Sequence, residues 1–158
     1  MVSASSPTSD LPFGKEDFEA LSAFRYQVRR YLRWSELLTR RMGVTNLQYL
    51  LMLHIRGFPG REWATITELA ERLQARHHGV VALVSRCEKL GLVERRASRA
   101  DRRQVEVHLT RKGDRTVDRL ARLHREELLR IEGGFSVPGK AQLTQAARQR
   151  SAVRGDNP

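Results

Sequence analysis

The residues with the clearest chemical potential are arginines gathered in one short segment. Residues 94–112 contain seven Lys or Arg against three acids. A guanidinium presents a rigid fork of donors that matches phosphates and base edges. So dense a positive charge repels itself unless an anionic partner neutralises it, and the narrow minor groove of DNA carries a strong negative potential. The segment therefore favours a contact with nucleic acid, made by Arg95, Arg96, Arg99, Arg102 and Arg103.

The other reactive side chains form no catalytic pattern. Cys87 is the single cysteine, so no internal disulfide is expected, and its position in an apolar stripe predicts a packing residue rather than a redox sensor. His77 and His78 are adjacent and point about 100° apart on a helix, without a His or Cys at i+4 to complete a metal pair. We find no phosphate loop or nucleophile elbow. The sequence thus predicts no enzyme, cofactor or metal site.

The apolar spacing predicts a series of helices that position these residues. Residues 1–14 are rich in Ser and Pro and favour a flexible arm. Apolar residues at three- and four-residue spacing predict a long helix over residues 15–41. Two capping boxes open the next helices, Thr45 with Gln48 and Thr65 with Glu68. After a turn of about three residues, a fourth helix follows, with an inward stripe of Val80, Leu83, Val84, Cys87 and Leu90.

The period then changes from helix to strand. Residues 92–96 and 104–109 alternate like strands, and the polar stretch between them predicts a hairpin tip. Residues 111–131 return to helical spacing and end at Gly133-Gly134, before a weakly structured tail.

Two helices joined by a tight turn and followed by a basic hairpin predict a winged helix-turn-helix, a mainly α fold with a small β-hairpin wing. Its second helix enters the major groove. Imidazole and guanidinium donors suit guanine, and small apolar side chains suit the thymine methyl group. An ordinary solvated helix face is the alternative. The outward residues of this helix are Arg76, His77, His78, Val81, Ala82, Ser85, Arg86 and Lys89.

Several motifs resemble the multiple antibiotic resistance regulator (MarR) family over about residues 15–131. The match lies in Leu69-Ala70-x-x-Leu73, Leu90-Gly91-Leu92-Val93 and, most specifically, Asp101-Arg102-Arg103 with Leu109-Thr110-x-x-Gly113. The resemblance implies a homodimeric transcription factor, usually a repressor, on a near-palindromic double-stranded DNA operator. It makes Arg103 the minor-groove residue and Asp101 its positioning partner. Asp101 is equally suited to close the turn through backbone N–H groups.

The resemblance also implies dimerisation helices from both ends of the chain. The expected organisation is a flexible arm (1–14), an N-terminal dimerisation helix (15–42), a DNA-binding lobe (43–110), a C-terminal dimerisation helix (111–132) and a weakly structured tail (133–158). The sequence departs from the family pattern at the start of the fourth helix and in the last helical region, residues 139–150, which has few large apolar residues. Arg76 stands where a Ser or Thr cap is common, and Leu143 is nearly the only large apolar residue of the last helical region.

Family members are often released from DNA by a small aromatic or anionic effector. Aromatic and Met residues at a helix junction are more often core residues than pocket residues, and that is the alternative here. The residues we expect around such a molecule are Tyr31, Trp34, Met52, His54 and Trp63.

The charge of the whole chain leaves further functions open. The net charge of +11 fits nucleic acid, an anionic surface or simple solubility. No apolar run approaches the roughly 20 residues of a membrane span, and residues 1–10 have Ser and Pro where a signal peptide needs an apolar core. We therefore expect a cytoplasmic protein without a membrane partner. Two alternatives remain beside the regulator: a non-specific architectural nucleic-acid-binding protein, and a winged-helix module that binds proteins.

Overall fold

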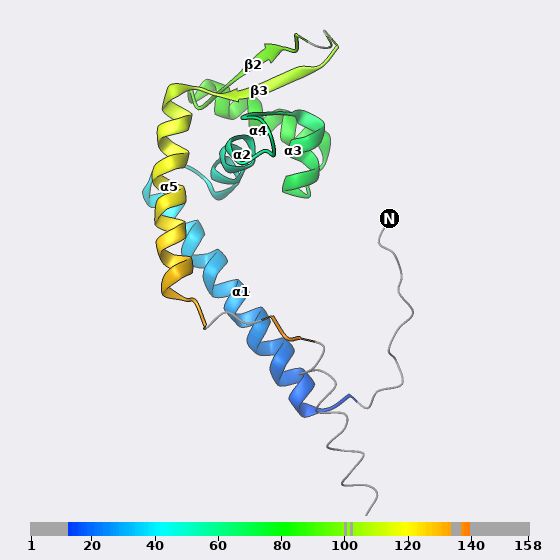
Figure 1. Cartoon of the computed structure of the whole chain (residues 1–158), viewed down its shortest axis with the longest axis vertical. Helices are drawn as coiled ribbons and strands as arrows, with labels where there is room; N and C mark the ends of the chain where they lie inside the picture. Colours follow the sequence, from blue (N-terminus) through cyan, green and yellow to red (C-terminus); the bar gives the residue numbers. More distant parts are fainter. Residues whose placement is uncertain (1–12, 100, 102, 134–136, 140–158) are drawn as a thin grey trace, which may run out of the picture. The chain divides into compact units, whose positions relative to one another are not determined.

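The computed structural model describes residues 13–99, 101, 103–133 and 137–139 (Figure 1). It confirms a mainly α fold with a small antiparallel sheet. Most of the expected arm and tail, residues 1–12 and 140–158, lies outside the described residues. In chain order the elements are α1 (Lys15–Arg41), α2 (Asn46–Arg56), β1 (Trp63–Thr65), α3 (Ile66–Leu73), α4 (His77–Lys89), β2 (Val93–Ala97), β3 (Val105–Leu109) and α5 (Arg111–Arg130).

The chain divides into two compact units. Residues 33–130 form one unit, which contains α2 to α5 and the C-terminal part of α1. The other unit consists of residues 1–32 and 131–158. In its described part, α1 begins where the Gly14 N–H donates to Asp17 Oδ2 at 2.8 Å. Phe13 and Phe18 pack there edge to face, and both are more than half exposed.

Both predicted capping boxes are present. The Thr45 hydroxyl accepts the Gln48 N–H at 3.2 Å, and the Gln48 side chain accepts the Thr45 N–H at 2.9 Å. At α3 the corresponding distances between Thr65 and Glu68 are 3.3 and 2.8 Å. Each box satisfies two backbone donors that a helix start would otherwise leave unpaired. This local bonding explains why the sequence located both helix starts to the residue.

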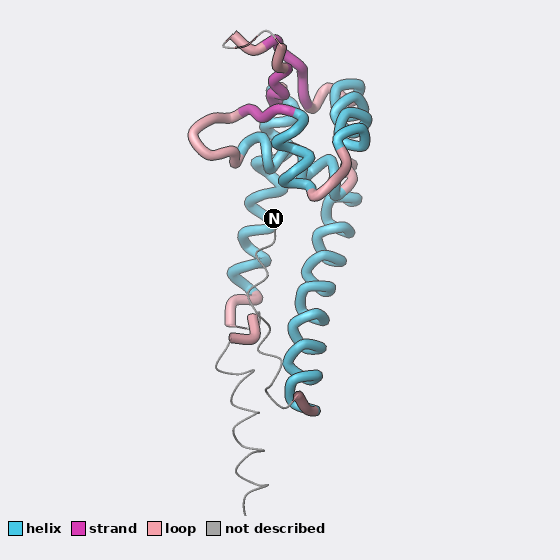
Figure 2. Tube along the Cα trace, turned by 90° about the vertical axis from the view of Figure 1, so that its right-hand side faces the viewer, coloured by secondary structure: helices cyan, strands magenta, loops and turns pink. Residues whose placement is uncertain are grey.

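The wing belongs to a three-stranded sheet, not to a two-stranded hairpin as predicted. The strand order is β1-β3-β2, and β1 is the strand that the sequence pattern missed. It has three residues, too few to show a period of two. Its strand conformation comes from pairing with β3, where Trp63 faces His108 and Ala64 faces Val107. In Figure 2 the strands lie together at one end of the unit formed by residues 33–130.

The core of this unit surrounds α2. Leu51, Met52 and Ile55 are fully buried and meet apolar residues from α3, α4, the sheet and α5. Cys87 is among the fully buried residues, as its position in the stripe predicted. The other fully buried side chains include Leu69, Val84, Val107, Val117 and Leu120. Helix α4 and the sheet are therefore held against one apolar centre.

The start of α5 is fitted closely against the base of the wing. The Thr110 hydroxyl accepts the Gly113 N–H at 3.1 Å, and the Thr110 N–H donates to the Leu92 carbonyl at 3.1 Å. A Cβ on Gly113 would lie only 1.9 Å from that same Leu92 oxygen. Glycine is required here because the helix backbone approaches the strand backbone too closely for any side chain.

Candidate nucleic-acid interface

Helix α4 begins with an uncapped and positively charged turn. Arg76 is the N-cap residue and its side chain makes no capping hydrogen bond, as its departure from the family pattern predicted. The first turn contains no acid, and Arg76, His77, His78 and Gly79 are exposed. Free N–H groups give a helix start a partial positive charge. The basic side chains add to this charge, so the turn is suited to an anionic ligand such as a phosphate.

The two faces of α4 separate apolar from polar side chains. Val80, Leu83, Val84 and Cys87 are buried in the core. The residues predicted to point outward are exposed, except for Ser85, which is half-buried; the exposed ones are His77, His78, Val81, Ala82, Arg86 and Lys89. This arrangement leaves one face of the helix available to a partner, with a small apolar area between basic ends.

The wing extends beyond α3 and α4 (Figure 1). It carries exposed arginines. Arg96 forms an exposed ion pair with Glu94, and Arg99 and Arg103 are exposed near the tip. Arg102 lies outside the described residues. The exposed guanidinium groups of this tip fit a surface of negative potential.

Asp101 closes the turn at the wing tip. Its Oδ1 accepts the backbone N–H of Arg103 at 3.0 Å, and its carbonyl accepts the Gln104 N–H at 2.9 Å. Of the two roles that the sequence left open, the structure shows this backbone role. No ion pair joins the side chains of these two described residues, Asp101 and Arg103. Asp101 therefore holds the backbone of the turn that carries Arg103, and the Arg103 side chain takes no part in holding this turn.

Arg95 differs from the other wing arginines because it points back to α4. One of its terminal nitrogens forms an ion pair with Glu88, and the other donates to Ser85 Oγ at 3.0 Å and to the Val81 carbonyl at 3.2 Å. Its backbone N–H also donates to Glu88, at 3.0 Å. The sequence analysis gave Glu88 no role, because a single acid on a basic helix offers no signal without its partner.

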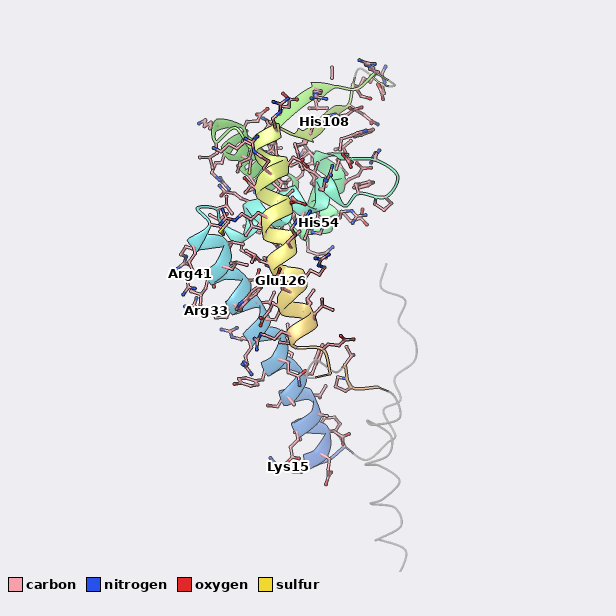
Figure 3. All side chains as sticks on the ribbon, turned by 60° about the vertical axis from the view of Figure 1, so that its left-hand side comes forward. Lys15, Arg33, Arg41, His54, His108 and Glu126 are labelled. Carbon is pink, nitrogen blue, oxygen red and sulfur yellow. The ribbon has the colours of Figure 1, made fainter. Side chains whose placement is uncertain are left out.

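A second cluster that the sequence did not reveal ties β1 to β3. The Arg61 guanidinium stacks on Phe58 and Trp63, with distances of 4.3 and 3.8 Å to the ring centroids. The Trp63 ring stacks in turn on His108, whose label in Figure 3 marks its place on β3. A hydrogen bond from His108 lowers the pKa of Glu106, so this carboxylate stays charged. The cluster holds the base of the wing to the loop before α3.

The residues proposed to surround an effector differ in their burial and in the side chains that they contact. Met52 is fully buried in the core, and Trp63 contacts Arg61 and His108. His54 is half-buried on α2 (Figure 3), where burial and then Arg72 lower the pKa of its imidazole. Trp34 packs edge-on against His124, 5.1 Å between centroids. Tyr31 belongs to the other compact unit.

His124 is a buried polar residue that the sequence analysis did not single out. Its Nδ1 lies 2.8 Å from the Leu120 carbonyl and its Nε2 lies 2.7 Å from Ser35 Oγ. The ring of Tyr49 stacks on it with 4.4 Å between centroids. Because a carbonyl only accepts, Nδ1 carries a proton. Burial lowers the pKa of His124 more than the Leu120 hydrogen bond raises it.

Comparison with known proteins gives this geometry a context. A sequence profile of the MarR family matches residues 42–104, from the end of α1 to the wing. This segment of the chain is therefore similar in sequence to the MarR family. A search of curated proteins finds no match to the sequence. No helix within the described residues is both long and apolar enough to cross a membrane.

Solved MarR-family structures share the fold over most of the chain. AbsC, a MarR-family transcriptional regulator from Streptomyces coelicolor, is 19% identical, with a TM-score of 0.68 over 92% of this chain and 99% of AbsC. The MarR-family regulator SP03579 is 25% identical, with a TM-score of 0.64 over 87% of each chain. MepR from Staphylococcus aureus is 17% identical, with a TM-score of 0.62 over 83% of this chain and 95% of its own. The fold is thus the DNA-binding fold of MarR-family transcriptional regulators.

Proposed function

We propose that the protein is a sequence-specific regulator of transcription that binds duplex DNA. In this proposal α4 lies in the major groove and the wing tip lies in the minor groove. One observation carries it: an uncapped, basic helix start and an exposed arginine tip occur on the same MarR-family lobe. The described residues proposed for contact are Arg76, His77, His78, Val81, Ala82, Arg86, Lys89, Arg96, Arg99 and Arg103.

The roles of these residues follow from the two grooves. A helix that enters the major groove reads bases with its N-terminal residues, so His77 and His78 are suited to guanine N7 or O6. Val81 is 37% exposed on the same face and is suited to a thymine methyl group. At the tip, Arg103 inserts into the minor groove and Arg99 neutralises phosphates.

We further propose that the protein acts as a homodimer. Several large apolar side chains of α1 are more than half exposed, with Phe18 at 62%, Tyr26 at 63% and Leu32 at 53%. Leu128 and Leu129 of α5 are exposed at 50% and 62%. Burying such a side chain contributes about 1.5–3 kcal/mol. A two-fold dimer also matches a near-palindromic operator with two half-sites.

We propose that the regulator represses its target and that a small aromatic or anionic effector releases it. The MepR neighbour is a transcription regulator of a multidrug efflux pump, which supports gene control by this fold. The candidate residues remain Tyr31, Trp34, Met52, His54 and Trp63, of which Trp34, His54 and Trp63 offer rings suited to stacking. Thermal-shift screening with aromatic carboxylates and their thioesters tests this step. An effector should raise the melting temperature and also weaken operator binding, whereas a screen without any stabilising compound contradicts it.

Selection of bound sequences from random duplexes tests the function itself. A regulator should enrich a palindromic consensus with half-sites about one helical turn apart. Binding without a consensus would instead favour an architectural protein, and a lack of binding would favour a protein-interaction module. Light scattering of the free protein measures its oligomeric state separately, and a monomer would contradict the proposed dimer.

Replacing Arg103 by Ala tests the wing. We expect operator affinity to fall by about 1–3 kcal/mol at fixed salt, the usual value of a specific groove contact. The turn itself should survive, because Asp101 holds the backbone N–H of Arg103 and not its side chain. Lys15→Ala is the matched control, since Lys15 is an exposed base at the far end of the sequence, paired with Glu19. Equal affinities of Arg103→Ala and the wild type would refute the contact.

A further inference from the structure

Arg95 joins the two elements that the proposed function assigns to different grooves. It lies on β2, and its partners Val81, Ser85 and Glu88 all lie on α4. These three residues are spaced by four and three, so they form one face of that helix. Arg95 also pairs across the sheet with Val107, which is fully buried in the core. The backbone of Arg95 is therefore held by β3, and its side chain is held by α4.

The hydrogen-bonding capacity of this group is used within the protein. Both terminal nitrogens of Arg95 have acceptors on α4, and the side chains of Arg95 and Glu88 are only 29% and 31% exposed. The Ser85 hydroxyl donates to the Val81 carbonyl at 3.0 Å, which leaves its lone pairs for Arg95. Glu88 is the only acid in the α4 sequence. An acid on a helix that approaches DNA is unfavourable by charge alone, so its presence requires another reason.

We infer that Arg95 and Glu88 are positioning residues that set the distance and angle between the recognition helix and the wing. The inference rests on the proposed function and changes the role of Arg95, and of Ser85, from DNA contact to internal support. The pair would let α4 and the wing tip meet their grooves at the same time. DNA binding then depends on an ion pair that itself contacts no nucleotide.

The length of the wing explains why this support matters. Arg99, near the tip, lies four residues beyond Arg95, a distance of about 13 Å along an extended strand. A rotation of about 10° at Arg95 would therefore move the tip by about 2 Å. Hydrogen bonds tolerate a few tenths of an ångström in donor–acceptor distance. A wing without the pair would thus have to be reordered on DNA, which weakens specific binding.

The direction in which Glu88→Gln changes the affinity for DNA distinguishes a positioning role from a purely electrostatic effect. Glu88→Gln keeps the size of the side chain and removes a negative charge near the DNA. If Glu88 positions the wing, affinity for the selected operator should fall by about three- to tenfold, the effect of weakening a charged hydrogen bond. Affinity for a scrambled duplex of equal length should stay the same or rise, because non-specific binding depends on charge. Tighter binding to both duplexes would overturn the inference.

Glu94→Gln is the matched control. Glu94 is also an acid of this region, next to Arg95 in sequence, but it pairs with the exposed Arg96 of its own strand. Its removal should leave operator affinity unchanged or raise it slightly, because it releases Arg96 for phosphate. An equal loss of operator affinity in both variants would overturn the assignment of Glu88, since it would show a general effect of removing acids from the wing.

Salt dependence tests Arg95 independently. Arg95→Gln should weaken operator binding but keep the slope of log affinity against log salt, because no phosphate contact is lost. A lost phosphate contact reduces the slope by about 0.9 for each site. A reduced slope would make Arg95 a DNA contact and overturn the inference. Urea unfolding of each variant checks that it is folded, and Arg95→Lys should recover part of the affinity. If the wild type selects no operator, the proposed function fails, and not this pair alone.

Discussion

Gly113 is the position where one added methyl group should do the most damage. A Cβ there would lie 1.9 Å from the Leu92 carbonyl oxygen, and real Cβ atoms stay at least 3.0 Å from their neighbours. Relief requires the start of α5 and the end of the α4–β2 connection to separate by about 1 Å. The nearest atoms are backbone oxygen and carbon, so no side chain can rotate away to make room.

The cost of Gly113→Ala has two parts. Overpacking of a closely fitted site costs about 1–3 kcal/mol. The separation would also lengthen the hydrogen bond from the Thr110 N–H to the Leu92 carbonyl, now 3.1 Å, beyond bonding distance. Losing it and the Thr110 hydroxyl bond to the Gly91 carbonyl costs about 1 kcal/mol each. We expect a loss of about 3–5 kcal/mol, a large part of the roughly 5–15 kcal/mol that stabilises a domain.

Urea unfolding followed by circular dichroism measures this loss. With a slope of about 1–3 kcal/mol per molar urea, the midpoint should fall by at least about 1 M. Gly79→Ala is the matched control, because a Cβ on this α4 glycine meets nothing within 4 Å. That change should stabilise the helix by about 0.5–1 kcal/mol. A Gly113→Ala protein with the wild-type midpoint would refute the steric reasoning.

Three further predictions concern the same lobe. The folded-state pKa of His124 lies below its unfolded value of 6.5, so the unfolded chain binds a proton more readily than the folded chain. The free energy of unfolding should therefore fall as the pH drops below 6.5. In His124→Gln it should fall less steeply. Equal slopes from urea titrations at pH 7.5 and 5.5 would contradict this role. Burial raises the pKa of the Cys87 thiol to about 11, so a thiol reagent at pH 8 should label it only after urea unfolds the protein; rapid labelling of the native state would show the side chain to be accessible. Thr65→Ala removes the α3 cap and should cost about 0.5–2 kcal/mol in thermal or urea unfolding, while Thr65→Ser should keep most of the stability. Identical losses in both variants would show that the hydroxyl does not carry the effect.

The sequence by itself determined the helices and much of the face proposed for DNA. Capping boxes and apolar spacing are local properties, so Thr45, Thr65 and most of the α4 stripe predicted helix starts and buried faces that the structure confirms. The prediction for Leu90, the last residue of that stripe, is wrong: Leu90 follows the end of α4 as the C-cap and is 46% exposed. The basic wing was visible because charge density needs no tertiary information. The glycine of the Leu-Thr-x-x-Gly motif was recognised as a pattern, although its physical reason was not apparent.

Only the tertiary structure decided which polar groups of different elements are partners. Strand β1 exists through pairing with β3, and the Glu88–Arg95 contact joins residues whose meeting depends on how β2 turns back along α4. The same holds for His124, which meets Ser35 across 89 positions of sequence. A periodic pattern records which side of an element is apolar, but it does not record which charged group lies opposite. For that reason the sequence found the arginines of the wing, and only the fold distinguished the one that supports it.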